Sequence, residues 1–166
     1  MADTKRLLIP DACVLIDFCL EDSTLLSLAA ASLGRVVVLS PVLSEVRQLS
    51  DVEADRLALT VVEPSMELVL NASARRGRLS FRDRLCLLFA KASGGTLYTN
   101  DKALLNAARS DGLDARWGLE ILLELVSAGE LVSQEALRIA RSIAGRWRFS
   151  SDALIEEFHL HFRSIR

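Results

Sequence analysis

The stretch SFRDRLCLLFAKASGGTLYTNDKALL, residues 80–105, decides the fold that we expect. It starts with a serine followed three residues later by Asp83, a capping-box pattern, and continues as an apolar helix to the glycines at 94–95. The apolar run TLYT at 96–99 then predicts a short strand, and the TND at 99–101 predicts the cap of another helix. A buried strand between two helices is typical of an α/β protein.

Three other short apolar runs predict further strands: RLLI at 6–9, VVVL at 36–39 and LTVV at 59–62. They are nearly continuous rather than alternating, as in parallel strands covered on both faces. Longer helical patterns separate them, and Ser40 followed by Pro41 predicts an N-cap and a first helical residue after the second run. With a weak strand near 114–116, these runs predict a three-layer α/β/α sandwich around a parallel sheet of four to five strands.

From Gly118 onward the pattern changes to three consecutive amphipathic helices with short joints. We therefore expect an α/β core over residues 1–117 and a helical extension over 118–166 that packs on the core.

Composition limits the class of protein. Half of the residues, 51%, are hydrophobic, so a folded core is expected rather than disorder. The net charge of −2 is not that of a protein that coats nucleic acid without a dedicated site. The three cysteines show no zinc spacing, and we interpret them as reduced thiols. No signal-peptide layout and no membrane-length apolar run is present in the sequence, so we expect a cytoplasmic protein.

Four acids occupy equivalent places along this pattern. Asp11 follows the first strand, and Glu45 lies one turn into the helix after the second. Asp83 opens the helix before the fourth strand, and Asp101 follows that strand. Because ligands of open parallel sheets bind beyond the carboxyl ends of the strands, we expect all four to meet in one cleft. Taken singly, each acid also has a simpler interpretation as a helix cap, a turn residue or a solvated helix residue.

Four carboxylates in one cleft would repel one another by about 1 kcal/mol per close pair in water, and by more when shielded. A divalent cation removes this cost, and oxygen ligands without His or Cys favour Mg²⁺ or Mn²⁺ over zinc. Such an ion can activate water and neutralise charge on a phosphodiester. Ser40, Thr99 and Asn100 stand next to the acids and could orient carboxylates or hold waters.

The chain resembles the PIN-domain nucleases, and within them the VapC-type toxins of toxin–antitoxin pairs. The resemblance rests on LLIPDACVLIDF at 7–18, LSPVLSEV at 39–46 and the stretch 80–105, and it covers about residues 5–117. It implies an α/β/α sandwich with an acidic pocket that binds Mg²⁺ or Mn²⁺. The residues that match the family's metal site, and so its catalytic residues, are Asp11, Glu45, Asp83 and Asp101. The family often has Asn, Ser or Thr where this chain has Cys13.

The resemblance also implies an activity and partners: endoribonuclease action on single-stranded RNA, a homodimer, and silencing by an antitoxin protein. Arginines at positions 76, 78 and 82 would form a phosphate-contacting rim beside the pocket; the alternative is a solvated loop and helix flank. In the tail, Trp147 and Phe149 are interpreted as core residues. His159 and His161 do not share a helix face, so we assign them no metal role.

The leading hypothesis is therefore a metal-dependent endoribonuclease that is the toxin of a toxin–antitoxin module. A first alternative is a PIN-like binding or scaffold module that no longer cuts. A second is a phospho-receiver-like switch, which also gathers acids at strand ends. Against that switch, the sequence has no paired acids after the first strand and no convincing lysine after a late strand.

Overall fold

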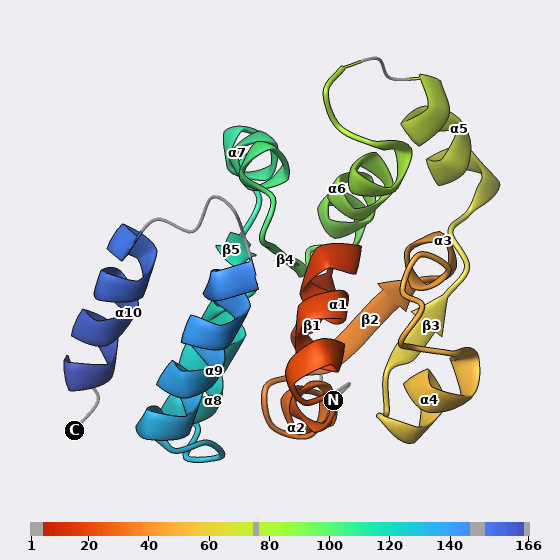
Figure 1. Cartoon of the computed structure of the whole chain (residues 1–166). Helices are drawn as coiled ribbons and strands as arrows, with labels where there is room; N and C mark the ends of the chain where they lie inside the picture. Colours follow the sequence, from red (N-terminus) through yellow and green to blue (C-terminus); the bar gives the residue numbers. More distant parts are fainter. Residues whose placement is uncertain (1–4, 75–76, 147–151, 165–166) are drawn as a thin grey trace. The chain divides into compact units, whose positions relative to one another are not determined.

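The computed structural model of the chain describes residues 5–74, 77–146 and 152–164. The chain divides into two compact units, Met1–Gly118 and Leu119–Arg166. Figure 1 shows the helices and strands of both units. Within the described residues, no helix is both long enough and apolar enough to cross a membrane.

The first unit contains a five-stranded sheet in the order β3-β2-β1-β4-β5, and every neighbouring pair is parallel. The strands are β1 Leu7–Pro10, β2 Arg35–Leu39, β3 Thr60–Val62, β4 Thr96–Thr99 and β5 Ala115–Trp117. Residues 36–39 and 96–99 are entirely buried, as expected for central strands that are covered on both faces. The predicted α/β/α sandwich with a parallel sheet is thus confirmed.

Seven helices in the described part of this unit connect and flank the strands (Figure 1). They are α1 Ala12–Glu21, α2 Thr24–Ser32, α3 Ser40–Leu43, α4 Asp51–Arg56, α5 Met66–Ala74, α6 Phe81–Ser93 and α7 Lys102–Ser110. Two parallel strands cannot be joined by a tight turn and need a longer crossover connection, which is usually helical. The helices between the strands are therefore expected in an all-parallel sheet.

The caps of α6 form as the sequence predicts. The Ser80 hydroxyl accepts the Asp83 amide at 3.1 Å, and the Asp83 carboxylate accepts the Ser80 amide at 3.0 Å. Gly94 ends the helix at φ +68°, a left-handed conformation that glycine adopts without steric cost. The chain then enters β4 and reaches Asp101, which caps α7. The stretch 80–105 therefore folds as helix, strand and capped helix.

The start of α3 differs from the prediction. Leu39 is the N-cap and Ser40 is already helical, so the Ser40 hydroxyl does not cap the helix. The helix ends at Leu43 after a single turn, and Glu45 lies in the turn that follows. The expectation that Glu45 is part of this helix is wrong, because the chain leaves the helix before reaching it.

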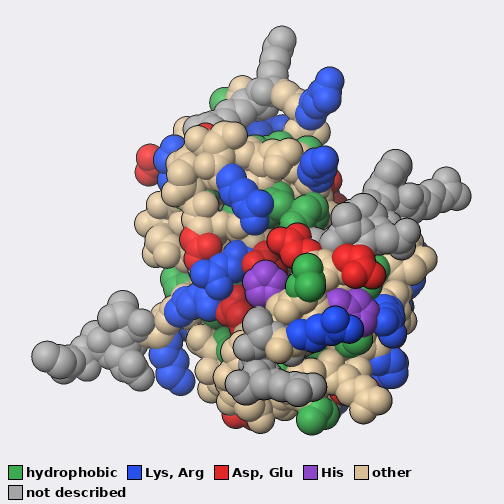
Figure 2. Space-filling model, turned by 90° about the vertical axis from the view of Figure 1, so that its left-hand side faces the viewer, with side chains coloured by type: hydrophobic (Ala, Val, Ile, Leu, Met, Phe, Trp, Pro, Cys, Tyr) green, Lys and Arg blue, Asp and Glu red, His purple; other side chains and the backbone are tan. Residues whose placement is uncertain are grey.

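The second unit consists of three helices, α8 Glu120–Ser127, α9 Ser133–Arg146 and α10 Asp152–Ser164. They bury apolar side chains at helical spacing, such as Leu122 and Leu125 on α8, Ile139 and Ile143 on α9, and Phe158 on α10. Trp147 and Phe149 lie outside the described residues. On the face in Figure 2, basic, acidic and histidine side chains are intermingled, so this face carries charges of both signs.

Candidate active site

Asp11 lies at the carboxyl end of the central strand β1 and is only 3% exposed. Its amide donates to the Tyr98 carbonyl of β4 at 2.9 Å, which fixes the backbone at this point. As the N-cap of α1, its carboxylate accepts the Val14 amide at 2.9 Å. Its other carboxylate oxygen accepts the Thr99 hydroxyl. Strand pairing and capping together therefore hold a buried acid at the sheet edge where ligands of parallel sheets bind.

Thr99 joins Asp11 to Asp101. It is the fully buried last residue of β4, and its hydroxyl oxygen accepts the Asp101 amide at 2.9 Å while the hydroxyl donates to Asp11. One oxygen of Asp101 caps α7 by accepting the amides of Ala103 at 2.7 Å and Leu104 at 3.0 Å. The carboxyl ends of β1 and β4 thus bring two of the predicted acids to the same threonine.

Asp83 is half-buried in the first turn of α6, and its charge acts on the Asp11 carboxyl group. The pKa of Asp11 is raised from 3.8 to about 7, mainly because burial disfavours the charged carboxylate. The hydrogen bonds from Thr99 and Val14 oppose this rise, whereas the charges of Asp83 and Asp101 add to it. We call Asp11, Asp83 and Asp101 the acidic site, because the fields of the last two converge on the first.

Glu45, the fourth predicted acid, forms an ion pair with an arginine. Its Oε1 accepts from Arg82 Nη1 at 2.7 Å, and Arg82 Nε also donates to the Pro41 carbonyl at 2.8 Å. The side chains of Glu45 and Arg82 are 39% and 40% exposed. The predicted auxiliary residue Ser40 donates its hydroxyl to Glu63, which follows β3, and not to one of the four predicted acids. Glu45 is therefore already paired with a cation of the chain itself.

The donor set of the acidic site suits a hard divalent cation. Its three side chains offer only oxygen, and a cation beside the buried Asp11 would offset both its desolvation and the repulsion from its neighbours. Burial, followed by the charges of Asp11 and Asp17, raises the pKa of the Cys13 thiol to about 12, so this cysteine stays protonated and is a poor ligand.

The described acids have ligand types that suit a divalent ion, but their spacing does not yet form a metal site. Among the described residues, no group of three or more His, Cys, Asp or Glu side chains lies close enough to hold a metal ion as it stands. One oxygen of Asp83 is engaged with Ser80, and one oxygen of Asp101 is engaged with the start of α7. The residues therefore fit a divalent ion by type, although the described side chains do not form a ready-made ligand group.

Asp17, which is not among the predicted site residues, is a buried acid beside the acidic site. It is 4% exposed on α1, and its Oδ2 accepts from Asn100 Nδ2 at 2.9 Å. The side-chain oxygen Oδ1 of Asn100 in turn accepts the Gly118 amide at 3.0 Å. Asn100, predicted as an auxiliary residue, thus links α1 to the segments after β4 and β5. The signal was present, because Asp17 lies three residues after the apolar Val14 and therefore shares its helix face.

The predicted arginine rim is only partly visible. Arg76 lies outside the described residues, and Arg78 is exposed. Arg82 contacts Glu45 and Pro41 as described above. The neighbouring Arg84 donates from Nε to the Ala72 carbonyl at 2.6 Å and from Nη1 to the Leu79 carbonyl. Of the arginines in this part of the chain that the structure describes, Arg78 is the one whose exposure best suits contact with a phosphate.

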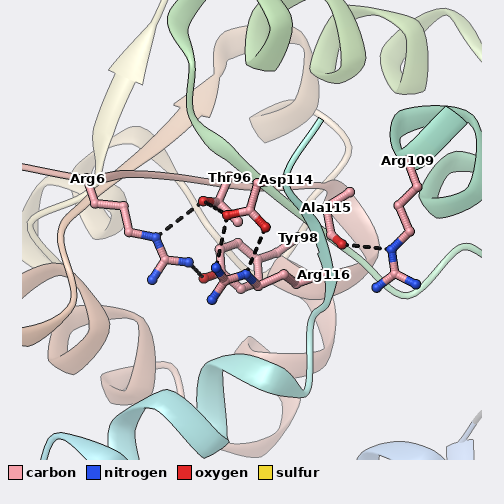
Figure 3. A network of polar contacts seen from close by, with 7 residues as sticks. All are labelled: Arg6, Thr96, Tyr98, Arg109, Asp114, Ala115 and Arg116. Atoms are coloured by element: carbon pink, nitrogen blue, oxygen red, sulfur yellow. Dashed lines mark hydrogen bonds and ion pairs between the residues drawn. The ribbon is translucent and has the colours of Figure 1, made fainter. Parts of the chain in front are cut away.

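A second polar network lies at the opposite, amino end of β4 (Figure 3). Arg6 donates to the hydroxyls of Thr96, at 3.2 Å, and Tyr98, and its guanidinium lies 5.7 Å from the Tyr98 ring centroid. Thr96 donates to Asp114, which also accepts from Arg116. Burial raises the pKa of Asp114, but the bonds from Arg116 and Thr96 outweigh it and the pKa is lowered. The carboxylate of this network is paired with an arginine, whereas the donors described above for Asp11, Asp83 and Asp101 are neutral amides and a hydroxyl.

Comparison with known proteins identifies the fold. No protein-family profile matches the sequence, and no curated protein matches it. Among solved structures, the chain is similar to a PilT N-terminus domain protein from the hyperthermophilic archaeon Sulfolobus solfataricus P2, with a TM-score of 0.54 and 15% sequence identity. The match covers 71% of this chain and 92% of that one. The chain therefore has the fold of PilT N-terminus, or PIN, domains.

Proposed function

We propose that this protein is a nuclease of the PIN type that uses Mg²⁺ or Mn²⁺ to cleave phosphodiester bonds of single-stranded RNA. The observation that carries the proposal is the buried Asp11 at the carboxyl end of the sheet, with the charges of Asp83 and Asp101 converging on it. The charges of neighbouring carboxylates make ionisation of a buried carboxylate unfavourable, and a bound cation offsets this cost. The PIN-like fold supports nuclease chemistry as the purpose of that cation.

In this mechanism the acidic site would hold the ion, with Glu45 able to join once it leaves Arg82. The bound ion would supply a water of lowered pKa and would neutralise charge on the phosphodiester. Thr99 and the Val14 amide fix the rotamer of Asp11, so this carboxylate is oriented before any ligand arrives. Asp83 Oδ2 accepts from the Ser80 amide, and its other oxygen, Oδ1, is the candidate acceptor of the proton from the attacking water. Arg78 would contact a phosphate of the RNA.

The proposed biological role is that of a toxin in a type II toxin–antitoxin module of the VapC kind. It rests on the resemblance of 7–18, 39–46 and 80–105 to those toxins. The role implies a cytoplasmic homodimer that an antitoxin protein silences.

Cleavage of a single-stranded RNA tests the activity. The wild type should cleave in Mg²⁺ or Mn²⁺ and stop in EDTA, and Asp11→Asn and Asp101→Asn should each abolish cleavage. Asp55→Asn is the matched control, because Asp55 is an exposed acid on α4 and should be dispensable. Equal activity in all four proteins, or none from well-folded wild type with either ion, would contradict the proposal.

One observation favours the second candidate, a binding module that has lost catalysis. The described acids do not form a ready-made ligand group, and Glu45 is neutralised by Arg82. Calorimetric titration with Mn²⁺ separates the two functions. A nuclease binds the ion in a manner that depends on Asp11, whereas a scaffold has no requirement for it.

A further inference from the structure

Arg82 makes two contacts that tie the first turn of α6 to the segment after β2. One is the ion pair from Nη1 to Glu45 at 2.7 Å, and the other is the hydrogen bond from Nε to the Pro41 carbonyl at 2.8 Å. Because two different guanidinium nitrogens are used, the plane of the side chain is fixed by both partners. The ion pair thus has a defined geometry although its members are partly exposed.

The same arginine directly precedes Asp83, a member of the acidic site. Glu45 is also near that site, because Asp11, Asp83 and Glu45 all act on the buried Cys86 thiol, whose pKa is raised first by burial and then by these charges. Glu45 and the two acids therefore lie around the same buried residue of α6, and the charge of Glu45 is balanced by Arg82. A metal ion and Arg82 would compete for one carboxylate.

We propose that Arg82 withholds Glu45 from the acidic site, so that a divalent ion must break this pair to recruit the fourth carboxylate. Arg82 is in this sense a positioning residue that lowers the affinity of the site for the ion. Its release would free a guanidinium beside Asp83 for an RNA phosphate, which links ion binding to substrate contact. The inference rests on the proposed function, since it assumes that the acidic site binds an ion.

The size of the effect follows from the exposure of the pair. Ion pairs with side chains as exposed as these are weak, so removing Arg82 should raise Mn²⁺ affinity by about two- to fivefold. Arg84→Gln is the matched control for the loss of one positive charge. Arg84 lies two residues further along α6, but it binds the Ala72 and Leu79 carbonyls and not a carboxylate.

The test is calorimetric titration of the full chain with Mn²⁺ in the absence of RNA. Arg82→Gln should bind about two- to fivefold more tightly than wild type, and Arg84→Gln should change affinity less. In a Glu45→Gln background, Arg82→Gln should have no larger effect than Arg84→Gln, because the carboxylate that it releases is gone. Thermal unfolding without Mn²⁺ verifies that each variant is folded. If Arg82→Gln does not fold, Arg82→Lys takes its place. This variant keeps the charge but loses the fork geometry of the guanidinium, and it should also bind Mn²⁺ more tightly than wild type.

Each outcome decides between the two proposals. Mn²⁺ binding that Asp11→Asn abolishes, but that the Arg82 and Arg84 variants change equally, overturns the role of Arg82 and leaves the proposed function standing. An effect of Arg82→Gln that persists undiminished without Glu45 also overturns it. Absence of Mn²⁺ binding in every variant overturns the proposed function and this inference together.

Discussion

The burial of Asp11 has a measurable consequence for stability in the absence of divalent ions. Its pKa is about 7 in the folded protein against an ordinary value of 3.8. Between these values the folded state keeps a proton that the unfolded state has released, so stability falls as the pH rises from about 4 to about 7. The difference between about 7 and 3.8, at about 1.4 kcal/mol per pH unit, gives a loss of about 4 kcal/mol that is complete above pH 7.

Replacing Asp11 by Asn removes this loss, because the amide does not ionise. Its carbonyl oxygen can still accept the Val14 amide, and the Thr99 hydroxyl can turn to accept from the new NH₂ group. The variant should therefore match the wild type near pH 4 and be more stable above pH 7, by as much as about 4 kcal/mol. Losing a proposed catalytic residue would thus stabilise the ion-free protein.

Urea unfolding at pH values from 4 to 8 in EDTA measures the effect as the difference between the two free energies of unfolding. Titrating groups shared by both proteins cancel in that difference, and Asp55→Asn serves as a control that should follow the wild type. Adding Mn²⁺ at pH 8 at about one hundred times its dissociation constant should restore about 2.7 kcal/mol to the wild type and nothing to Asp11→Asn. Parallel pH profiles for wild type and variant would show that the pKa of Asp11 is not raised in the folded protein.

Three further substitutions or treatments test the surroundings of the site. Gly118→Ala should cost about 1–3 kcal/mol in calorimetric unfolding, since its Cβ would lie 2.5 Å from Val14 Cγ2 and 2.9 Å from Asn100 Oδ1; an unchanged melting temperature would show that this packing yields freely. Ser80→Ala should cost about 1 kcal/mol by removing the cap of α6, and unaltered urea unfolding would contradict that role. Cys86 should resist iodoacetamide at pH 8 until the protein is unfolded, because burial raises its pKa and shields it; mass spectrometry showing rapid native labelling would contradict this.

The sheet and its helices were predictable because the sequence marks them locally. Continuous apolar runs such as 36–39 identify strands that are buried on both faces, and Ser80 with Asp83 marks the start of α6 by contacts within a single turn. Gly94 marks its end for the same local reason. The weak strand expected near 114–116 forms one residue later, at Ala115–Trp117, where pairing with β4 sets its limits.

The features that the sequence does not show depend on contacts between distant residues. The ion pair of Glu45 with Arg82 joins the segment after β2 to α6, and the hydrophobic periodicity of a single element does not predict such a contact. From the sequence alone, Asp17 is interpreted as a helix-surface acid. The structure shows that this interpretation is wrong, because Asp17 is buried and its carboxylate accepts from Asn100, which follows β4. The meeting of Asp11, Thr99 and Asp101 was predictable, since all three stand at the ends of neighbouring parallel strands.

Anomalous X-ray scattering from crystals grown or soaked with Mn²⁺ would show whether the acidic site binds a divalent ion. We predict a difference peak bounded by the carboxylates of Asp11, Asp83 and Asp101, and no such peak in crystals of Asp11→Asn. A well-ordered wild-type structure in saturating Mn²⁺ with no peak among these three side chains would contradict this prediction.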